Sequence, residues 1–388
     1  MTDQEIAEMF ETAELCVYCR CGCCKDGCPM YAEILEESIS PKGRNELIRA
    51  ISKGIVEPDE RALRIAFSCL LCKRDEFSCS AQLKNADVTE SFRRYLLGRG
   101  VPMLPEHDLL AKNLANYGNP WGESKSARKR WAKDFLSKRF VNGKTETLFY
   151  VGCTFSLDRT LQESPRALAS LMQKAKEDFG LLLDDELCCG STAKRIGAAA
   201  LFEKVQKLNS EKIRATGAKR IVTACSGCFK TLKQDYGGLL NGIEILHSTE
   251  YIALMIEQGR LKLDELPKKV TYHDPCHLGR HAGVYDAPRR ILSSVSRLKL
   301  IEMRNSREKS GCCGGGAGVK TAYPSISQKV AVRRIVEAEK TGAEMLVTTC
   351  PFCMQTLKSA AQESGSKIEV IELSVLIDRI SHPKGGRK

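Results

Sequence analysis

The chain has 388 residues and a formal net charge of +12, with 43% hydrophobic and 28% charged residues. This composition is typical of a folded globular protein and excludes a disordered chain. Lys and Arg are spread along the whole length, so we interpret the charge as a solvated surface and expect no nucleic-acid partner. No apolar run approaches the roughly 18 to 20 residues that span a bilayer, and the acidic N-terminus is unlike a signal peptide. We expect a cytoplasmic protein that reaches the inner face of a membrane only through a partner subunit.

Nineteen cysteines indicate the class of site. In a short secreted chain they would predict disulfides, but this chain is long and we expect it in a reducing compartment. Clustered thiolates in such a compartment indicate a metal, either zinc or an iron–sulfur cluster. The spacing of the cysteines distinguishes these two possibilities.

Residues 1–100 contain two cysteine runs, separated by helical patterns over Asn45–Ser52 and Glu60–Phe67. The first run ends in a Cys-Pro pair and matches the ferredoxin spacing C-x2-C-x2-C-x3-C-P at its last three cysteines. Two other cysteines compete for the first ligand position. The matching cysteines are Cys21, Cys24 and Cys28, and the competing ones are Cys16 and Cys19.

The second run extends from Cys69 to Cys79 and departs from the motif at one ligand position, where Asp75 replaces a cysteine. In paired motifs of this kind the last cysteine of each run ligates the other cluster. We therefore expect Cys79 to complete the first cluster, and Cys28 to join Cys69, Cys72 and Asp75 around the second. A carboxylate is a harder ligand than a thiolate, which predicts a labile or tuned second cluster. The alternatives are a single N-terminal cluster or a zinc ribbon.

The first 100 residues thus predict an α-helical, ferredoxin-like domain, and residues 101–146 follow as a connector punctuated by Pro and Gly. Within the connector, Lys125–Lys138 is basic and carries Trp131 and Phe135 at helical spacing. A basic face with aromatic residues can stack nucleic-acid bases. We favour an ordinary amphipathic helix that docks through these two aromatic side chains.

From residue 147 on, strand and helix patterns alternate twice in the same order. Such alternation predicts two duplicated α/β units with small parallel sheets, over residues 147–260 and 261–388. The expected strands are Thr147–Val151, Arg220–Ala224, Ile243–Leu246, Lys269–Tyr272, Leu298–Glu302, Met345–Thr349 and Lys367–Ile371. The expected helices are Leu157–Glu177, Thr192–Thr216, Phe229–Gln234, Ser248–Gln258, Pro288–Val295, Ser325–Lys340 and Ser374–Ile380.

Ten cysteines in these units form two matching sets of five. Each set has a lone cysteine, a Cys-Cys-Gly and a Cys-x-x-Cys, placed at the ends of strands where ligands bind in parallel sheets. Five thiolates exceed the four of a cubane or a zinc site, which indicates an unusual cluster or a redox-active pair. Glycines after each Cys-Cys pair (Gly190, Gly314 and Gly315) would let the backbone approach an anionic cluster. The first set is Cys153, Cys188, Cys189, Cys225 and Cys228, and the second is Cys276, Cys312, Cys313, Cys350 and Cys353.

The loop around Cys276 distinguishes the second unit, because three histidines and Arg280 gather there. A histidine beside a thiolate can supply the protons that disulfide cleavage requires. The alternative is that each histidine only hydrogen-bonds the loop or the sulfur atoms. Arg280 would neutralise cluster charge or bind an anionic substrate. We place the reaction at the second unit, with Cys276, Cys312, Cys313, His273 and His277 as candidate catalytic residues.

Two ferredoxin runs followed by two Cys-Cys-Gly units resemble the CCG-domain iron–sulfur oxidoreductases. That family includes the D subunit of heterodisulfide reductase and the iron–sulfur subunits of anaerobic glycerol-3-phosphate, glycolate and lactate dehydrogenases. The resemblance covers nearly the whole chain and includes the HDPCH loop, His273–His277. It implies a non-cubane [4Fe–4S] cluster on each five-cysteine set, in addition to one or two N-terminal cubane clusters.

The resemblance also implies an oxidoreductase subunit that needs a partner. Electrons would come from a flavoprotein or cytochrome b subunit and reduce an anionic disulfide substrate. The alternative function is an electron relay for a flavin-dependent lactate, glycolate or glycerol-3-phosphate dehydrogenase. A zinc-loaded structural or nucleic-acid-binding protein is the candidate from a different class.

Overall fold

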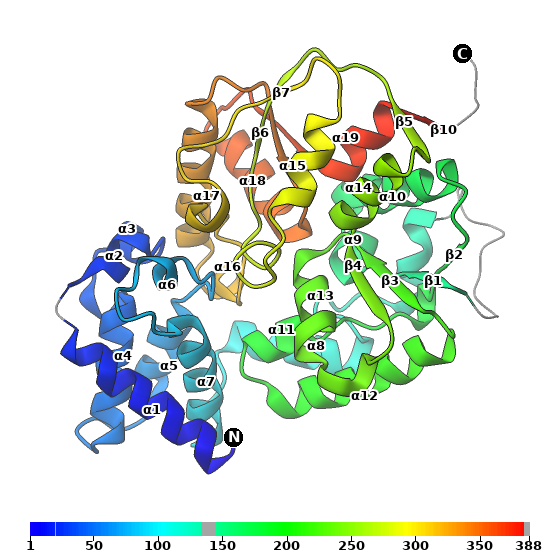
Figure 1. Cartoon of the computed structure of the whole chain (residues 1–388). Coiled ribbons are helices and arrows are strands. Elements are labelled where there is room, and N and C mark those ends of the chain that lie inside the picture. Colours follow the sequence, from blue (N-terminus) through cyan, green and yellow to red (C-terminus); the bar gives the residue numbers. More distant parts are fainter. Residues whose placement is uncertain (20, 133–144, 384–388) are drawn as a thin grey trace.

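The computed structural model describes residues 1–19, 21–132 and 145–383. Its N-terminal part, blue in Figure 1, is a group of helices that lies beside the rest of the chain. Short polar caps explain where several helices begin: the Ser40 side chain accepts the Gly43 N–H at 2.9 Å, and Asp59 accepts the Ala62 N–H at 2.7 Å. The helices are α1 (Asp3–Tyr18), α2 (Cys23–Gly27), α3 (Tyr31–Ile34), α4 (Pro41–Ser52), α5 (Glu60–Phe67), α6 (Arg74–Ser78) and α7 (Asn85–Gly98).

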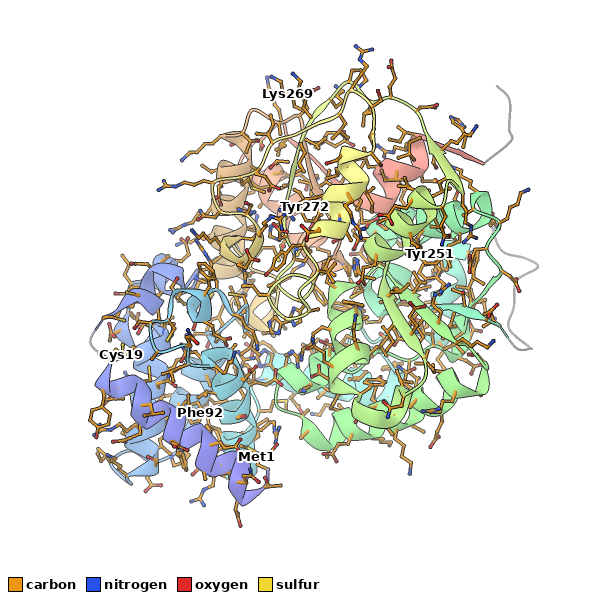
Figure 2. All side chains as sticks on the ribbon, in the orientation of Figure 1. Met1, Cys19, Phe92, Tyr251, Lys269 and Tyr272 are labelled. Carbon is orange, nitrogen blue, oxygen red and sulfur yellow. The ribbon has the colours of Figure 1, made fainter. Side chains whose placement is uncertain are left out.

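Apolar faces of α1, α4, α5 and α7 form a separate core for this helical part. Ile48, Leu63, Phe67 and Phe92 are fully buried there. Figure 2 shows Phe92 among these helices, whereas Cys19 lies at the outer edge. The two expected helices between the cysteine runs are confirmed, as α4 and α5. Helix α8 (Pro105–Tyr117) and the 3-10 helix Lys125–Ala132 then lead into the first α/β unit.

The first unit contains a four-stranded parallel sheet in the order β2-β1-β3-β4. Its strands are β1 (Thr147–Phe149), β2 (Phe179–Gly180), β3 (Arg220–Thr223) and β4 (Glu244–His247). Its helices are α9 (Cys153–Leu157), α10 (Glu163–Lys174), α11 (Ser191–Arg195), α12 (Ala199–Ala215), α13 (Ser226–Lys230) and α14 (Ser248–Glu257).

The second unit repeats this arrangement with a parallel sheet in the order β7-β6-β8-β9. Its strands are β6 (Lys269–Tyr272), β7 (Lys299–Leu300), β8 (Met345–Thr348) and β9 (Glu369–Glu372). Its helices are α15 (Asp286–Ser293), α16 (Val319–Ala322), α17 (Pro324–Glu339), α18 (Pro351–Glu363) and α19 (Leu373–Arg379). The expectation of two parallel sheets is confirmed.

One continuous hydrophobic core extends through both units, so they are packed as a single body. An antiparallel pair of strands, β5 (Leu261–Leu263) and β10 (Ser381–Pro383), brings the C-terminal segment back against the junction of the units. The sequence patterns did not predict this pair. No helix in the described ranges is long and apolar enough to cross a membrane.

Several expected elements differ from the structure at their ends. The helix expected over Leu157–Glu177 is divided into α9, a 3-10 turn and α10, and the one expected over Thr192–Thr216 is divided between α11 and α12. Gly197, at a φ of +81°, separates the second pair. Helix α14 is capped by the His247 ring. In the connector, Trp131 is buried as expected, whereas Phe135 lies outside the described residues.

Candidate iron–sulfur centres

The ten cysteines of the two five-cysteine sets line one cavity of about 260 Å³. The cavity lies between the units. Strands β1 and β3 of the first unit and β6 and β8 of the second all end at it, and each is followed by a cysteine loop. The two walls are joined directly: Ser226 of the first Cys-x-x-Cys donates to the Thr349 carbonyl beside the second, at 2.9 Å. The sequence predicted two separate sites, and the tertiary structure places both sets on one cavity.

The sulfur atoms are close together within each set and between the sets. Cys153 Sγ lies 3.6 Å from Cys188 Sγ, and Cys313 Sγ lies 3.2 Å from Cys353 Sγ. A hydrogen bond between Cys225 and Cys350, which belong to different sets, contributes to the low pKa of Cys350. Hydrogen bonds from Cys188 and Cys228 lower the pKa of Cys189 to about 5. These hydrogen bonds lower the pKa of several of the ten sulfurs. A lower pKa favours the thiolate, which is the form that binds metal.

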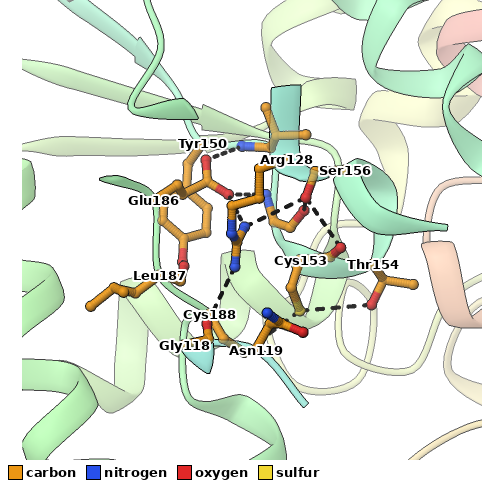
Figure 3. A network of polar contacts seen from close by, with 12 residues as sticks. Gly118, Asn119, Arg128, Tyr150, Cys153, Thr154, Ser156, Glu186, Leu187 and Cys188 are labelled. Atoms are coloured by element: carbon orange, nitrogen blue, oxygen red, sulfur yellow. Dashed lines mark hydrogen bonds and ion pairs between the residues drawn. The ribbon is translucent and has the colours of Figure 1, made fainter. Parts of the chain in front are cut away.

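A buried ion pair supports the lone cysteine of the first set (Figure 3). Arg128 donates to Glu186 at 3.2 Å, and both side chains are almost fully buried. Glu186 in turn accepts the backbone N–H groups of Val151 and Gly152, at 2.9 and 2.8 Å, directly before Cys153. Because both charges are compensated and hydrogen-bonded, the pair fixes the loop without leaving a buried charge unpaired.

A different charge network supports the lone cysteine of the second set. Asp274 accepts both Nη atoms of Arg289, at 2.7 and 3.0 Å, and also the Arg307 N–H. On the cavity side, His277 lies with Nδ1 3.5 Å from Cys276 Sγ, and its ring stacks on that of His281 at 4.5 Å. The Nε2 atom of His281 lies 2.8 Å from the Leu71 carbonyl, which joins this loop to the N-terminal part.

The three predicted glycines serve packing more than access to the cavity. Only Gly315 lines it, beside Thr356 and Phe352. Gly314 has a φ of +81°, and a Cβ there would lie 2.3 Å from the Ser327 carbonyl of α17. Gly190 also has a φ of +81° and packs against Phe202. The glycine that approaches a sulfur is Gly152, where a Cβ would lie 3.1 Å from Cys228 Sγ.

In the helical part, cysteines of both runs meet at a small surface cavity. The residues that line it include Cys79 of the second run together with four cysteines of the first: Cys16, Cys19, Cys21 and Cys24. Cys21 is exposed, and a hydrogen bond with Ser80 lowers its pKa to about 6. Cys79 thus lies where the crossed arrangement requires it, and both candidates for the first position remain beside it.

Two further cysteines of the runs, Cys28 and Cys69, face inward around Arg44. Cys28, Cys69 and Asp75 are buried, and their charges act on the fully buried Arg44 guanidinium. Asp75 Oδ2 is buried and has no hydrogen-bond partner among the described residues, which fits a carboxylate oxygen available as a metal ligand.

Cys72 connects the helical part to the second five-cysteine set. A hydrogen bond from Cys312 holds its pKa below that of a free thiol. Arg280 donates to the Cys72 carbonyl and to the carbonyls of Glu308 and Ser310. Arg280 therefore lies among thiols with Nε and Nη1 bonded to backbone, whereas its buried Nη2 has no hydrogen-bond partner among the described residues.

Arg93 is a residue that the sequence patterns missed. Its guanidinium is fully buried and donates to carbonyls in three parts of the chain, those of Cys69, Arg195 and Ala317. It therefore holds the helical part and both units in one arrangement. In the sequence nothing distinguishes it from the exposed Arg99 just after the end of the same helix.

The donor chemistry fits iron–sulfur clusters. All nineteen cysteines are free thiols, and those of the two five-cysteine sets converge without forming disulfides. Buried sulfur ligands of this density suit iron–sulfur centres better than zinc, which takes four ligands. When bound, such clusters would supply one-electron storage and transfer at the positions of these sulfurs.

A protein-family model described as a cysteine-rich domain, CCG, matches residues 147–233 and 270–358. The chain is 31% identical over 360 residues to the D subunit of dihydromethanophenazine:CoB–CoM heterodisulfide reductase from Methanosarcina mazei, a match that covers 87% of both proteins. It is 28% identical to an EtfAB:quinone oxidoreductase of Syntrophomonas wolfei, over 90% of this chain and 56% of that protein. It is also 28% identical to FadF, a probable iron–sulfur-binding oxidoreductase of Bacillus subtilis, over 79% of this chain and 46% of FadF.

The fold is also similar to the crystal structure of a hypothetical protein from Helicobacter pylori. The TM-score is 0.53 at 11% identity, over 89% of this chain and 68% of that one. The long matches in sequence and the duplicated cysteine-rich domain agree with each other. The chain therefore belongs to the CCG-domain family of iron–sulfur oxidoreductases that includes the D subunit of heterodisulfide reductase.

Proposed function

We propose that this protein reduces a disulfide in the cavity between its two units. The observation that carries the proposal is that both complete five-cysteine sets line the same cavity. Two one-electron centres on opposite walls suit a two-electron reaction. The disulfide takes up two electrons and two protons, its S–S bond breaks, and two thiols leave.

The proposed ligands are the cysteines of each site. The two sets in the α/β units would each hold a cluster, for which the family implies the non-cubane type. In the helical part, which we interpret as ferredoxin-like, Cys79 would complete a cubane held by the first run. Cys28, Cys69, Cys72 and Asp75 would hold the second.

The positions of these sites support one order of electron transfer. Cys21 is exposed, so a cluster on the first run would lie near the surface, within reach of a flavoprotein or cytochrome b partner that delivers electrons. The second site is buried and reaches the second five-cysteine set through the Cys72–Cys312 contact. The Cys225–Cys350 contact then joins the two sets. Electrons thus enter at the helical part and end at the shared cavity.

His277 is the proposed proton donor to the leaving thiolate. It lines the cavity, its Nδ1 lies 3.5 Å from Cys276 Sγ, and its buried Nε2 has no partner among the described residues. A histidine ring N–H at this distance can give its proton to a thiolate. On this proposal His277→Gln lowers turnover and leaves iron content unchanged.

A direct test uses oxygen-free holoprotein, reduced methyl viologen as donor, and dithiodipropionate or hydroxyethyl disulfide as substrate. Cys312→Ser should abolish thiol release and preserve the cubane signals in electron paramagnetic resonance (EPR). Cys23→Ser is the matched control, because Cys23 is exposed and belongs to none of the proposed ligand sets. Loss of the cubane signals in the Cys312 variant would contradict the separation of modules. Zinc in a colourless protein would exclude the proposal.

The second candidate is a relay that passes electrons to another acceptor. It is favoured by the match to an EtfAB:quinone oxidoreductase and by aromatic side chains on the cavity wall, where Trp121 and Phe352 lie 6.2 Å apart. This candidate predicts no thiol release from either disulfide, and quinone reduction only when a flavoprotein dehydrogenase is added.

A further inference from the structure

His273 is buried behind the second five-cysteine set and is held there by an arginine. Arg334 donates from Nε to His273 Nδ1 at 3.1 Å. The arginine is itself fixed by Glu337 at 2.6 Å and by Ser310 at 3.1 Å. One ring nitrogen of His273 and the sulfurs of Cys313 and Cys353 all lie within 4.8 Å of one another. This geometry alone is compatible with a metal site made of one histidine and two cysteines.

The hydrogen bond from Arg334 determines the protonation of the ring. Arginine keeps its protons and can only donate, so Nδ1 must present its lone pair. A doubly protonated ring would place two N–H groups against each other. Nδ1 is therefore the acceptor, and the N–H of the ring is on Nε2. This Nε2 is buried and has no hydrogen-bond partner in the described part of the chain.

We propose that His273 is a hydrogen-bond donor to the sulfurs of the second set, and that Arg334 is the positioning residue that makes it one. An iron-bound histidine normally donates its other N–H to an acceptor. Here the other nitrogen faces a donor, and ligation through Nε2 would require an imidazolate. The inference rests on the proposal that the second set holds a cluster, and it assigns His273 a tuning role in place of proton transfer.

The first unit has the same construction with a different outcome. The backbone N–H of His273 donates to the Val347 carbonyl, and the backbone N–H of Tyr150 donates to the Val222 carbonyl, both at 2.9 Å. Tyr150 is therefore the structural equivalent of His273. Asn209 donates to the Tyr150 hydroxyl at 3.1 Å, as Arg334 does to His273. The tyrosine then donates its single proton to the Leu187 carbonyl at 2.6 Å.

His273 therefore adds to the second set an N–H donor to sulfur that Tyr150 does not supply to the first, apart from the His277 contact with Cys276 described above. Such a donor stabilises the electron-rich, reduced form of a cluster and raises its reduction potential. The second set should accept electrons at a more positive potential than it would without His273. This difference makes the two walls of the cavity unequal although their cysteines match.

Pulsed EPR on reduced holoprotein labelled with ¹⁵N-histidine tests the assignment without any substrate. We expect weak nitrogen couplings and proton couplings that exchange in deuterated water from His273 and from His277, and the His273 contribution should be lost in His273→Phe and kept in His277→Gln. A strong nitrogen coupling would show that His273 is an iron ligand and would overturn the inference. Arg334→Lys, which keeps the charge but not the Nε donor, should weaken the exchangeable proton coupling and keep the iron.

Redox titration gives a second readout with a matched control. His273→Phe should shift the potential of one five-cysteine cluster to more negative values, and His273→Gln, which keeps an N–H, should restore part of the shift. Tyr150→Phe is the control at the equivalent position and should shift neither potential. Equal potentials in His273→Phe and wild type, or an equal shift in Tyr150→Phe, would refute the tuning role. Failure of disulfide reduction with these couplings intact would contradict the proposed function alone.

Discussion

Replacing Gly314 by alanine tests whether the second Cys-Cys-Gly loop depends on its contact with α17. The new Cβ would lie 2.3 Å from the Ser327 carbonyl, a backbone atom that cannot rotate away. Ser327 also donates its hydroxyl to the Gly314 carbonyl at 2.8 Å, so the two segments are held face to face. The loop that carries Cys312 and Cys313 must therefore move.

Gly342→Ala is the matched control. Gly342 also has a positive φ, of +68°, but a Cβ there meets nothing within 4 Å. Both variants place alanine in the left-handed region, at about 1–2 kcal/mol each. Only Gly314→Ala adds a steric clash, for which overpacking typically costs about 1–3 kcal/mol. Because 1.4 kcal/mol is about a factor of ten, the second loop should open about five- to a hundred-fold more often than in the control.

The assay is the rate of iron release from oxygen-free holoprotein to an excess of chelator, followed by absorbance. If local opening of the loop limits release, the rate follows the opening equilibrium. EPR identifies which cluster is lost first. Equal rates for the two variants, or first loss of an N-terminal cluster in Gly314→Ala, would refute the reasoning.

Three further predictions concern other parts of the molecule. Cys79→Ser should remove the EPR signal of the surface N-terminal cluster and keep the buried one, because Cys79 lines the cavity of the first run; loss of the buried cluster instead would contradict the crossed ligation. Asp235→Asn should lower the free energy of unfolding by about 3–5 kcal/mol, because it removes a buried carboxylate shared by Lys194, Arg195 and Lys230. Lys194 and Arg195 keep their ion pairs with Glu90, whereas Lys230 loses its partner carboxylate. In chemical denaturation the exposed-pair control Glu265→Gln should lose at most about 1 kcal/mol. Glu372 is buried, and desolvation raises its pKa to about 8 from 4.5. Between about pH 4.5 and 8, Glu372 holds a proton in the folded protein and has released it in the unfolded chain. Its contribution to the free energy of unfolding is therefore complete below about pH 4.5 and is lost as the pH rises through about 8. Glu372→Gln should flatten the fall in stability between pH 5 and 8, and an unchanged slope would show that Glu372 does not titrate there.

Local patterns predicted the elements that carry the site. Strand β6 (Lys269–Tyr272) has the expected bounds, and β8 and α17 differ from their expected ranges only at the ends. The cause is short-range: alternation of apolar residues and the caps at helix starts are written in neighbouring positions. The same reasoning failed where a helix is broken, as at Gly197, because a segment of favourable composition does not reveal that Arg93 and Leu97 pack against its bend.

The buried cations could not be predicted in this way. Arg44, Arg93 and Arg334 are hidden among thiols, carbonyls and a histidine, yet in sequence they are indistinguishable from the basic residues of the surface. Burial of a charge is decided by partners that are distant in the chain. Arg93 and the Ala317 carbonyl, for example, are 224 positions apart.

The duplication, the two sets of five cysteines and their place at the ends of parallel strands can be read from spacing and periodicity, because both are local properties. The shared cavity, the Cys72–Cys312 contact and the Arg334–His273 hydrogen bond depend on how the units pack. Those contacts arise when the apolar faces of the two units and the helical domain are buried together. That burial brings into contact side chains that no local sequence pattern connects.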